Sequence, residues 1–551
     1  MQKAFLLNTF KNLIPNLACF LCLLMLDGYH ANAQPGHENI PANVPAEQKW
    51  WNLLHYTIDL KPDYASKFIT GSNAITFRAL ETGNVMEVSL IEPLKVTAVS
   101  WHNKPLIYQK KTSDYFISFP GNIKKGDTAT VTIVFEGKPI VANRPPWDNG
   151  WIWATDKKGR PWMSIACEGY GAAAWLPCKN VLYDEPDSGV LFSITVPDTL
   201  VAVANGRLQK QANNHNGTST YTWKVVNPIN NYDIIPYIGK YVTWHNDYAG
   251  LKGKLDRDYW VLDYNLDKAK KHLQQTDTLL RCLEYWCGPY PFYEDGYKIV
   301  EAPMVGMEHQ SAIAYGNGFE NGYSGKNLSG TQWGLKWDFV LMHETGHEWF
   351  GNSITASNDG ESWIHEGFTK YLETIYTTYL YGTEAGNDYT LGIWKRIVND
   401  VPVLGSGSQD AYNKGCAMLH AIRQIVGDTV FRGLLTGLNK EFYHSTVSTP
   451  QILRYMNAYT KKDLSKLVDQ YLTTTKIPVL EYFFKNDTFN YRWVNCVNDF
   501  NMPVKASFSK QKGVFIYPTT AWKTMPADNR LQHIFIIDPN FYVQVKEVKP
   551  G

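Results

Sequence analysis

The chain has few of the features that mark nucleic-acid-binding or membrane-spanning proteins. Its 53 Lys and Arg residues are balanced by 52 Asp and Glu residues, which gives a formal net charge of only +1, and it has no long basic run. Proteins that bind nucleic acids or anionic membranes through charge usually carry such a run. Nor does any apolar stretch reach the roughly 20 residues that a transmembrane helix needs. We therefore expect no nucleic-acid partner and no transmembrane segment.

Cysteine is also scarce, with 8 residues among 551. None of these cysteines shows the two-by-two spacing of a structural zinc site, and a chain of this length does not need disulfides as a scaffold. Cys167 and Cys178 form the only local pair that merits a test for a disulfide. Cys282 and Cys287 fall on one predicted helix, where they do not face each other well.

The first 33 residues have the pattern of a secretory signal peptide. Two lysines precede an apolar run at residues 17–26, and the small residues at 31–33 offer a cleavage site for a signal peptidase. A lipid anchor on Cys19 or Cys22 is less favoured, because the residues before Cys19 match a lipobox poorly. We therefore expect a soluble protein that is exported, either to the periplasm or out of the cell.

The remaining sequence changes its periodicity twice, which predicts a multidomain α+β protein. In residues 34–246, short runs of alternating apolar and polar residues are broken by Gly, Pro, Asn and Asp, as expected for an N-terminal β domain. Residues 247–476 show helical periodicity, and residues 477–551 return to strand patterns that predict a small C-terminal β domain. The clearest helical segments are residues 267–286, 333–350, 364–381, 415–426 and 464–471.

The most informative feature is the string H-E-T-G-H at residues 343–347, followed by Glu366 nineteen positions after the second histidine. Side chains four residues apart share one face of a helix, so His343 and His347 can both direct a ring nitrogen at one metal ion. Glu366 lies at the start of a second predicted helix, and its carboxylate completes a His, His, Glu set. This set is typical of catalytic zinc sites that leave one coordination position open. We predict one Zn²⁺ ion bound by these three residues.

Glu344 has the chemistry of a general base beside that metal. It is rotated by roughly 100° from His343 around the helix, which leaves its carboxylate free to accept a proton from a water that zinc has acidified. So short a string also occurs by chance on ordinary helices. Here the apolar flanks at residues 339–342 and 349–350 predict a buried helix, whose histidines and carboxylates need partners such as a divalent metal. The pattern therefore favours a metallopeptidase.

Three further motifs accompany the zinc-binding pattern. The first is V-G-M-E-H at residues 305–309, before the zinc-binding helix. The second begins with C-E-G at residues 167–169 and continues with W-L-P-C and D-E-P downstream. The third is Y-N-K-G at residues 412–415, just before a predicted helix. In these motifs and their order, the chain resembles the zinc aminopeptidases typified by membrane alanyl aminopeptidase, whose relatives include leukotriene hydrolase. The resemblance spans roughly residues 50–480.

The resemblance assigns a role to the first of these motifs. By the likeness of residues 305–309 to the family's G-x-M-E-N string, Gly306, Met307 and Glu308 belong to the substrate-binding site, and Glu308 binds the free α-amine of the substrate. A carboxylate that pairs with an ammonium group in a poorly solvated pocket rejects a peptide whose amine is blocked. Considered alone, Glu308 reads equally well as an ordinary loop carboxylate. His309 departs from the family pattern, which usually has Asn there.

Two more residues receive roles from the same resemblance. Glu168 falls on the position that gives the substrate amine a second contact, although without the family it reads as a surface residue. Tyr412 would donate a hydrogen bond to the oxyanion that forms during hydrolysis. Glu361 occupies a place where an acidic residue could hold a ligand histidine, and a solvated carboxylate at a helix start is an equally good interpretation.

The architecture that the resemblance implies is an N-terminal β domain, a thermolysin-like, mainly helical catalytic domain and a small C-terminal β-sandwich. The large helical C-terminal domain of many members is expected to be missing, which would leave the cleft open or let another subunit close it. The function expected is that of a zinc aminopeptidase acting on peptides with a free N-terminus. The alternatives are a metalloendopeptidase or an epoxide hydrolase on the same scaffold, or a catalytically inactive peptide-binding protein.

Overall fold

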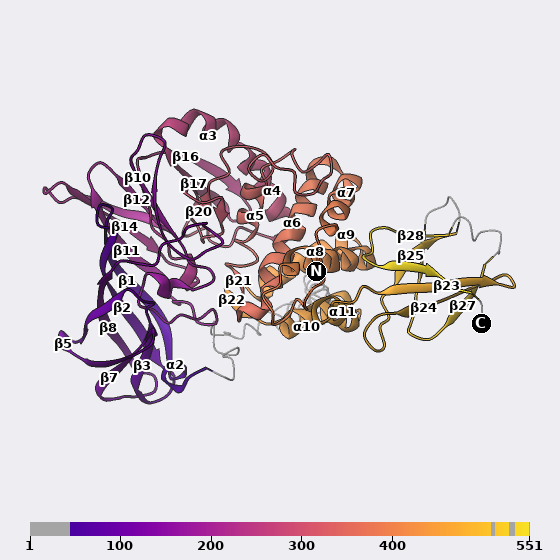
Figure 1. The fold of residues 1–551 in the computed structure, drawn as a ribbon, viewed down its shortest axis with the longest axis horizontal. Coiled ribbons are helices and arrows are strands. Elements are labelled where there is room, and N and C mark those ends of the chain that lie inside the picture. Colours follow the sequence, from indigo (N-terminus) through magenta and orange to yellow (C-terminus); the bar gives the residue numbers. More distant parts are fainter. Residues whose placement is uncertain (1–43, 509–512, 528–534, 550–551) are drawn as a thin grey trace, which may run out of the picture.

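The computed structural model describes residues 44–508, 513–527 and 535–549. The predicted signal peptide lies outside these residues. Figure 1 shows a β-rich N-terminal region, a helical middle region and small sheets at the C-terminal end, placed in this order along the long axis of the molecule. The predicted multidomain α+β organisation is thereby confirmed. None of the described helices combines the length and the hydropathy that a membrane span requires.

Within the described residues, the N-terminal region is built from three sheets. The largest has the strand order β13-β14-β11-β1-β2-β8-β4-β5, and the two others have the orders β12-β15-β10-β9 and β3-β7-β6. Alternate residues such as Val131, Ile133 and Phe135 are buried, because successive side chains of a strand point to opposite faces. The elements are α2 (Ala46–Lys49), β1 (Trp51–Asp63), β2 (Phe68–Ala79), β3 (Gly83–Ser89), β4 (Lys95–Trp101), β5 (Lys104–Pro105), β6 (Ile107–Lys111), β7 (Asp114–Ile123), β8 (Thr128–Gly137), β9 (Gly150–Thr155), β10 (Pro161–Ala166), η1 (Ala172–Ala174), β11 (Val190–Pro197), β12 (Val201–Val203), β13 (Arg207–Asn213), β14 (Thr218–Val225), η2 (Asn231–Asp233) and β15 (Tyr237–Gly239).

A five-stranded sheet of order β16-β17-β18-β20-β19 separates the N-terminal region from the helices. Ile299 and Ile313 pack into the core of the helical region, whereas their neighbours Val300 and Ala314 pack into the N-terminal core. The strands of the sheet that carry these four residues are therefore buried on both faces. The domain boundary predicted between residues 246 and 247 falls inside β16, the first strand of this sheet. Its strands are β16 (Tyr241–Gly250), β17 (Gly253–Leu262), β18 (Tyr297–Glu301), β19 (Gly306–Met307) and β20 (Ile313–Tyr315).

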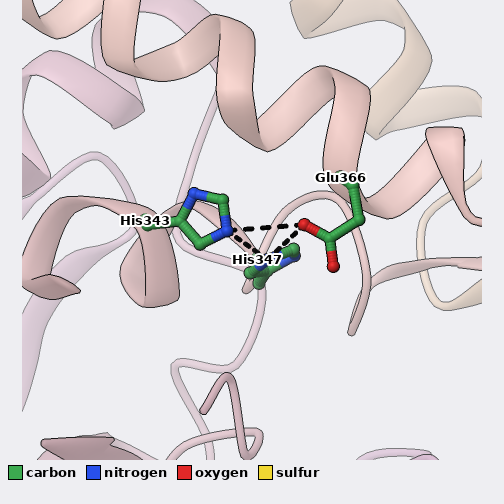
Figure 2. A group of neighbouring side chains, drawn as sticks. All are labelled: His343, His347 and Glu366. Atoms are coloured by element: carbon green, nitrogen blue, oxygen red, sulfur yellow. Dashed lines mark hydrogen bonds and ion pairs between the residues drawn. The ribbon is translucent and has the colours of Figure 1, made fainter. Parts of the chain in front are cut away.

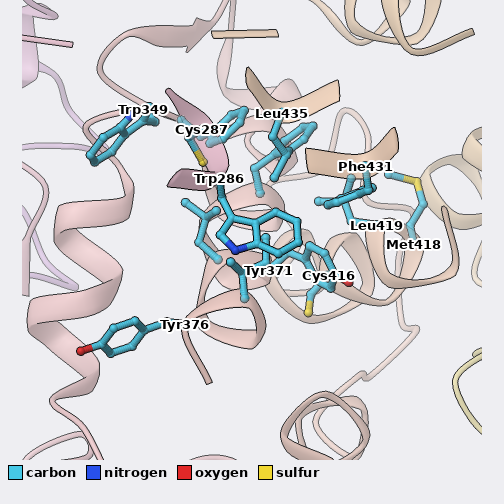
Figure 3. Packing of buried hydrophobic residues seen from close by; sticks show 14 of the residues in the cluster. Trp286, Cys287, Trp349, Tyr371, Tyr376, Cys416, Met418, Leu419, Phe431 and Leu435 are labelled. Atoms are coloured by element: carbon cyan, nitrogen blue, oxygen red, sulfur yellow. The ribbon is translucent and has the colours of Figure 1, made fainter. Parts of the chain in front are cut away.

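The helical region surrounds one apolar core. Figure 3 shows part of this packing, in which Trp286, Tyr371 and Leu435 from three different helices come together. The helix predicted over residues 267–286 is divided into α3 and α4, and the helix predicted over 333–350 is limited to α5. The elements are η3 (Asp263–Asn265), α3 (Leu266–His272), α4 (Gln275–Cys287), α5 (Phe339–Gly346), β21 (Ile354–Ala356), η4 (Asp359–Glu361), α6 (Trp363–Tyr381), α7 (Thr383–Trp394), α8 (Asp410–Val426), α9 (Asp428–Glu441), β22 (Ser445–Val447), α10 (Thr449–Thr460) and α11 (Ser465–Thr473).

Two small sheets follow α11 in the described residues, with the strand orders β27-β24-β23-β29 and β26-β25-β28. Tyr542 attaches them to the helical region, because its hydroxyl accepts a hydrogen bond from Asn399 Nδ2 (3.0 Å) and its carbonyl accepts one from Tyr471 Oη (2.8 Å). The strands are β23 (Val479–Lys485), β24 (Thr488–Val494), β25 (Val504–Ser507), β26 (Val514–Ile516), β27 (Lys523–Pro526), β28 (Ile536–Ile537) and β29 (Gln544–Glu547). The six cysteines of the described residues, Cys167 and Cys178 included, are free thiols.

Candidate metal centre and substrate cleft

His343, His347 and Glu366 converge at the junction of α5 and α6 (Figure 2). The Nε2 atoms of the two histidines lie 3.2 Å apart. Glu366 Oε2 lies 3.4 Å from His343 Nε2 and 3.5 Å from His347 Nε2. Asp338 caps the start of α5 by accepting a hydrogen bond from Leu341 N at 3.0 Å. The cap and the four-residue spacing together direct both histidines towards Glu366, as predicted.

The geometry of these three residues fits a tetrahedral zinc ion. Zinc bonds of about 2.0–2.1 Å at tetrahedral angles place neighbouring ligand atoms about 3.3–3.4 Å apart, which agrees with the separations observed. Glu366 Oε2 is buried and forms no hydrogen bond within the described residues. An orphaned, buried carboxylate oxygen facing two imidazole nitrogens is costly unless a cation joins them. Burial opposes ionisation of Glu366, but the two histidines outweigh it and lower its pKa.

The other nitrogen of each ligand histidine is held by the protein. His343 Nδ1 is bonded to Glu373 Oε1 at 2.9 Å, and His347 Nδ1 to the Phe350 carbonyl at 3.0 Å. Both partners accept hydrogen bonds, so each Nδ1 carries a proton whether the ring is neutral or charged, and each Nε2 is the nitrogen that faces the metal position. Glu373 is itself fixed by Lys370, whose ammonium nitrogen lies 2.9 Å from it. The ring orientations are therefore set before any metal binds.

Glu361 does not hold a ligand histidine. Its carboxylate accepts a hydrogen bond from Thr449 N at 2.6 Å and another from the hydroxyl of the same residue, at the start of α10. Glu361 is thus a carboxylate at a helix start, but the helix is α10 and not α6, which follows it in the sequence. Glu373, which holds His343, was not predicted. The sequence feature that could have identified it is its position seven residues after Glu366, because two helical turns return a side chain to nearly the same face of the helix.

Glu344 lies beside the triad and faces Gly306. A Cβ atom on Gly306 would be 2.6 Å from Glu344 Oε1, so only glycine leaves room for this carboxylate. Burial raises the pKa of Glu344 to about 7, even though His343 acts in the opposite direction. A carboxylate with a pKa near neutrality is suited to accept and return a proton. The next residue of β19, Met307, is buried and lines the same cleft as Glu344.

Glu308 follows β19 and lies close to both Glu344 and His347. One carboxylate atom of Glu308, one of Glu344 and a ring nitrogen of His347 lie within 4.8 Å of one another. The hydroxyl of Tyr232 donates a hydrogen bond to Glu308 Oε1 at 2.9 Å. Asn352 Nδ2 donates to the main-chain carbonyl of Glu308 at 2.7 Å. The carboxylate is therefore presented to the cleft from a fixed backbone.

Glu168 reaches the cleft from the N-terminal region. Its side chain is exposed to the solvent of the cleft, yet the enclosing protein and the nearby carboxylate of Glu308 raise its pKa well above the usual range. Asn149 Oδ1 accepts hydrogen bonds from Gly169 N (2.9 Å) and Tyr170 N (3.1 Å), which joins the Glu168 segment to a second loop. That loop carries Trp147, which also lines the cleft and is 67% exposed.

Tyr412 is brought to the triad by a close crossing of α6 and α8. A Cβ atom on Gly415 would lie only 2.9 Å from Gly367 Cα, so the two helices can meet at this distance only where both residues are glycine. Glu366 precedes Gly367 by one residue, and Tyr412 precedes Gly415 by one helical turn. The ring centroids of Tyr412 and His343 lie 6.0 Å apart. The crossing explains why the tyrosine and the glycine occur together in the sequence motif.

All the predicted site residues line one cleft of about 940 Å³ between the N-terminal and helical regions. Five acidic side chains, those of Glu168, Glu308, Glu344, Asp359 and Glu366, line it, against two basic ones, those of Lys370 and Arg396. Lys370 is paired with Glu373, so the acidic groups of the cleft remain in excess. The cleft therefore offers an anionic environment beside a candidate metal site, which suits a cationic group on a ligand.

Two family models match the chain, in the order expected from its fold. The Peptidase M1 N-terminal domain matches residues 52–232, and the Peptidase family M1 domain matches residues 264–403. The second match includes all three residues of the triad. The two matches account for the β-rich N-terminal region and for α5 and α6, at whose junction the candidate metal site lies.

Curated relatives and solved structures agree with these matches. Leukotriene A-4 hydrolase of Xenopus laevis is 24% identical over 76% of this chain and 70% of its own length. Human aminopeptidase B is 23% identical over 64% of this chain, and the matched part covers 55% of the length of aminopeptidase B. An M1 zinc metallopeptidase variant from Deinococcus radiodurans, solved with a Tyr-Ser-Ala substrate, has a TM-score of 0.68 at 21% identity and covers 78% of this chain and 96% of its own. A two-domain variant bound to L-tryptophan has a TM-score of 0.67 with the same identity and coverage. The chain therefore belongs to peptidase family M1, a zinc metallopeptidase by its family and by the ligand set that it carries.

Proposed function

We propose that the protein is an aminopeptidase that removes the N-terminal residue of peptides. The observation that carries this proposal is the position of two carboxylates, Glu308 and Glu168, in the cleft that also contains the candidate metal site. A free α-amine is cationic at neutral pH, and a buried carboxylate such as that of Glu308 binds it strongly, while the solvent-exposed side chain of Glu168 supplies a second contact. Substrates held by their amine can present only the first peptide bond to the metal. This arrangement favours an exopeptidase.

Each residue of the site has a distinct chemical task in the proposed reaction. His343, His347 and Glu366 would hold a zinc ion, which would supply the Lewis acidity that acidifies water and polarises the scissile carbonyl. Glu344 accepts the proton of the attacking water and delivers it to the leaving amine. The hydroxyl of Tyr412 donates a hydrogen bond to the oxyanion of the tetrahedral intermediate.

Similar proteins support the proposal. Human aminopeptidase B is a distant relative, and the structures with TM-scores of 0.67 and 0.68 are bound to an amino acid and to a tripeptide substrate. We further propose that the protein is exported, since residues 1–33 have the pattern of a signal peptide. Export would bring the enzyme into contact with peptides outside the cytoplasm.

The first experiment is the hydrolysis of a panel of aminoacyl anilides, each with a free and with an N-acetylated amine. The panel is measured with the protein as purified, after chelation, and after zinc is restored. Cleavage of the free-amine substrates alone, lost on chelation and regained with zinc, is the expected result. Equal cleavage of acetylated substrates would point to an endopeptidase and against amine recognition. Absence of cleavage by the zinc-loaded protein would reject the proposal in favour of epoxide hydrolysis or peptide binding.

A further inference from the structure

Tyr232 connects the N-terminal region to the proposed amine site. It lies in η2, is buried, and donates its hydroxyl hydrogen to Glu308 Oε1 at 2.9 Å. Its main-chain carbonyl accepts a hydrogen bond from Cys167 Sγ at 3.4 Å, and Cys167 directly precedes Glu168. One residue of the N-terminal region therefore contacts both segments that supply the proposed amine ligands. No residue of the sequence motifs contacts both segments in this way among the described contacts.

The contacts of Glu308 leave one oxygen for a substrate. Its main chain is held by Asn352, and its Oε1 accepts the hydrogen bond of Tyr232. No hydrogen bond to Oε2 occurs within the described residues, and the residue lines the cleft. A carboxylate fixed through one oxygen presents the other in a defined direction, which reduces the entropy lost when an ammonium group binds.

We propose that Tyr232 is a positioning residue for amine recognition: it orients the Glu308 carboxylate so that Oε2 receives the α-ammonium group of the substrate. The N-terminal region then takes part in selecting free N-termini and does more than cover the cleft. This inference rests on the proposed aminopeptidase function and names the residue that makes its amine site selective.

The electrostatics of the pair agree with this role. Burial, together with the carboxylates of Asp233 and Glu308, raises the pKa of Tyr232 well above its ordinary value. The phenol therefore remains protonated and acts only as a donor. Without its hydroxyl, Oε1 of Glu308 would be a buried acceptor with no donor, and the carboxylate could turn away from the position that binds the amine.

The test uses two zinc-binding inhibitors that differ only in the α-amine: leucine hydroxamate and 4-methylpentanohydroxamate. Their dissociation constants are measured by calorimetry on the zinc-loaded full chain and on the Tyr232→Phe variant. We expect the variant to bind the amine-bearing inhibitor roughly 10- to 100-fold more weakly, the range for loss of a hydrogen bond to a charged group. The amine-lacking inhibitor should bind within about twofold of wild type, because it makes no contact with Glu308.

Tyr237 provides a matched control. It is also a buried tyrosine of the N-terminal region, and its hydroxyl donates to the carbonyl of Ala312 at 2.7 Å and lies 2.5 Å from His309 Nδ1. Tyr237→Phe removes a hydroxyl that crosses the same interface without touching Glu308. It should leave the ratio of the two dissociation constants unchanged. A similar loss of amine preference in Tyr237→Phe, or an equal weakening of both inhibitors in Tyr232→Phe, would overturn the inference and indicate a purely structural role.

A second pair of variants tests whether the effect of Tyr232→Phe passes through Glu308. Glu308→Gln removes the carboxylate that Tyr232 holds, and Tyr232→Phe is then added to it. If Tyr232 acts through Glu308, the double variant keeps the amine preference of Glu308→Gln within about twofold. A further loss would contradict the inference. If the wild-type protein binds both inhibitors equally, the proposed amine recognition itself is rejected. If the wild type prefers the amine-bearing inhibitor and Tyr232→Phe keeps that preference, only the role of Tyr232 is rejected.

Discussion

The two walls of the cleft differ in how they are built. One wall consists of α5, α6 and α8, where the triad and Tyr412 are fixed by a helix cap, by Glu373 and by a glycine crossing. The other consists of segments of the N-terminal region, where Glu168, Tyr232 and Trp147 are held by hydrogen bonds between loops. Helices give the precision that bond cleavage needs, while loops can vary in sequence and still carry recognition.

This division separates two kinds of effect. Substitutions in the helical wall should change the rate of the chemical step, which appears in kcat. Substitutions in the N-terminal wall should change which substrates bind and how tightly, which appears in KM or in the ratio of rates between substrates. Single substitutions in each wall test this separation: a helical-wall variant that changes only substrate preference, or an N-terminal-wall variant that changes only kcat, would contradict it.

Glu344→Gln should have the largest effect, because it removes the proposed general base and keeps the shape of the side chain. We expect kcat to fall by roughly 10²- to 10⁴-fold. Zinc content, measured by atomic absorption, should stay the same, since Glu344 is not part of the triad. A variant that retains most of its activity would show that another group takes the proton, and one that loses zinc would show that the residue acts as a ligand.

Tyr412→Phe tests the proposed oxyanion donor in the same wall. Loss of such a donor costs roughly 10²- to 10³-fold in kcat, with little change in KM. Tyr323→Phe is a suitable control, because Tyr323 lines the same cleft and its hydroxyl has no hydrogen bond within the described residues. Steady-state kinetics on one leucyl anilide are sufficient to compare the two variants. Equal losses in both would assign the effect to general packing of the cleft.

The sequence predicts the helical wall better than the other wall, for a physical reason. His343, His347 and Glu366 lie within 24 residues, and the helical repeat alone brings the histidines to one face. Tyr412 could be identified only through its motif, because no local periodicity indicates that Gly415 meets Gly367. Family resemblance likewise supplied Glu308 and Glu168, whose spacing along the chain carries no geometric signal.

Residues that position other side chains through hydrogen bonds were the hardest to predict from the sequence. Tyr232 lies 76 residues before Glu308 and has no distinguishing neighbours in the sequence. Its role depends on how the N-terminal region packs against the five-stranded sheet, which is a property of the tertiary structure. Glu361 and Glu373 show the same difficulty at short range: both follow the zinc-binding string, and only the direction of the helix decides which one reaches His343.

Zinc affinity should rise with pH, which tests the charge balance of the helical wall. Burial acts to lower the pKa of His343, but Glu366 and Glu373 outweigh it and raise this pKa to about 9. Below that pH a proton must leave the ring before Nε2 can bind the metal. The affinity should therefore increase about tenfold per pH unit for each proton displaced, and level off above about pH 9.

Competition with a chelator between pH 6 and pH 9 would measure this dependence, in a range set by the raised pKa of His343. His365 serves as the control, because burial lowers its pKa to about 4 and it is already neutral in this range. His365→Gln should leave the number of displaced protons unchanged. A zinc affinity that does not vary with pH would show that the ligand histidines are neutral before the metal binds.

Trp147→Ala should have the smallest effect and the most selective one. The loop of Trp147 is joined by Asn149 to the Glu168 segment, and its indole lines the same cleft as the site proposed for the α-amine, where it is available to a substrate side chain. Loss of that apolar contact should lower kcat/KM roughly fivefold for leucyl and phenylalanyl anilides, and leave alanyl anilide nearly unchanged. Tyr517→Ala, which removes a 60% exposed aromatic side chain of the C-terminal sheets, should change neither. An equal decrease in kcat/KM for all three anilides would show that Trp147 affects catalysis in the way expected for the helical wall. That result would contradict the distinction between the two walls.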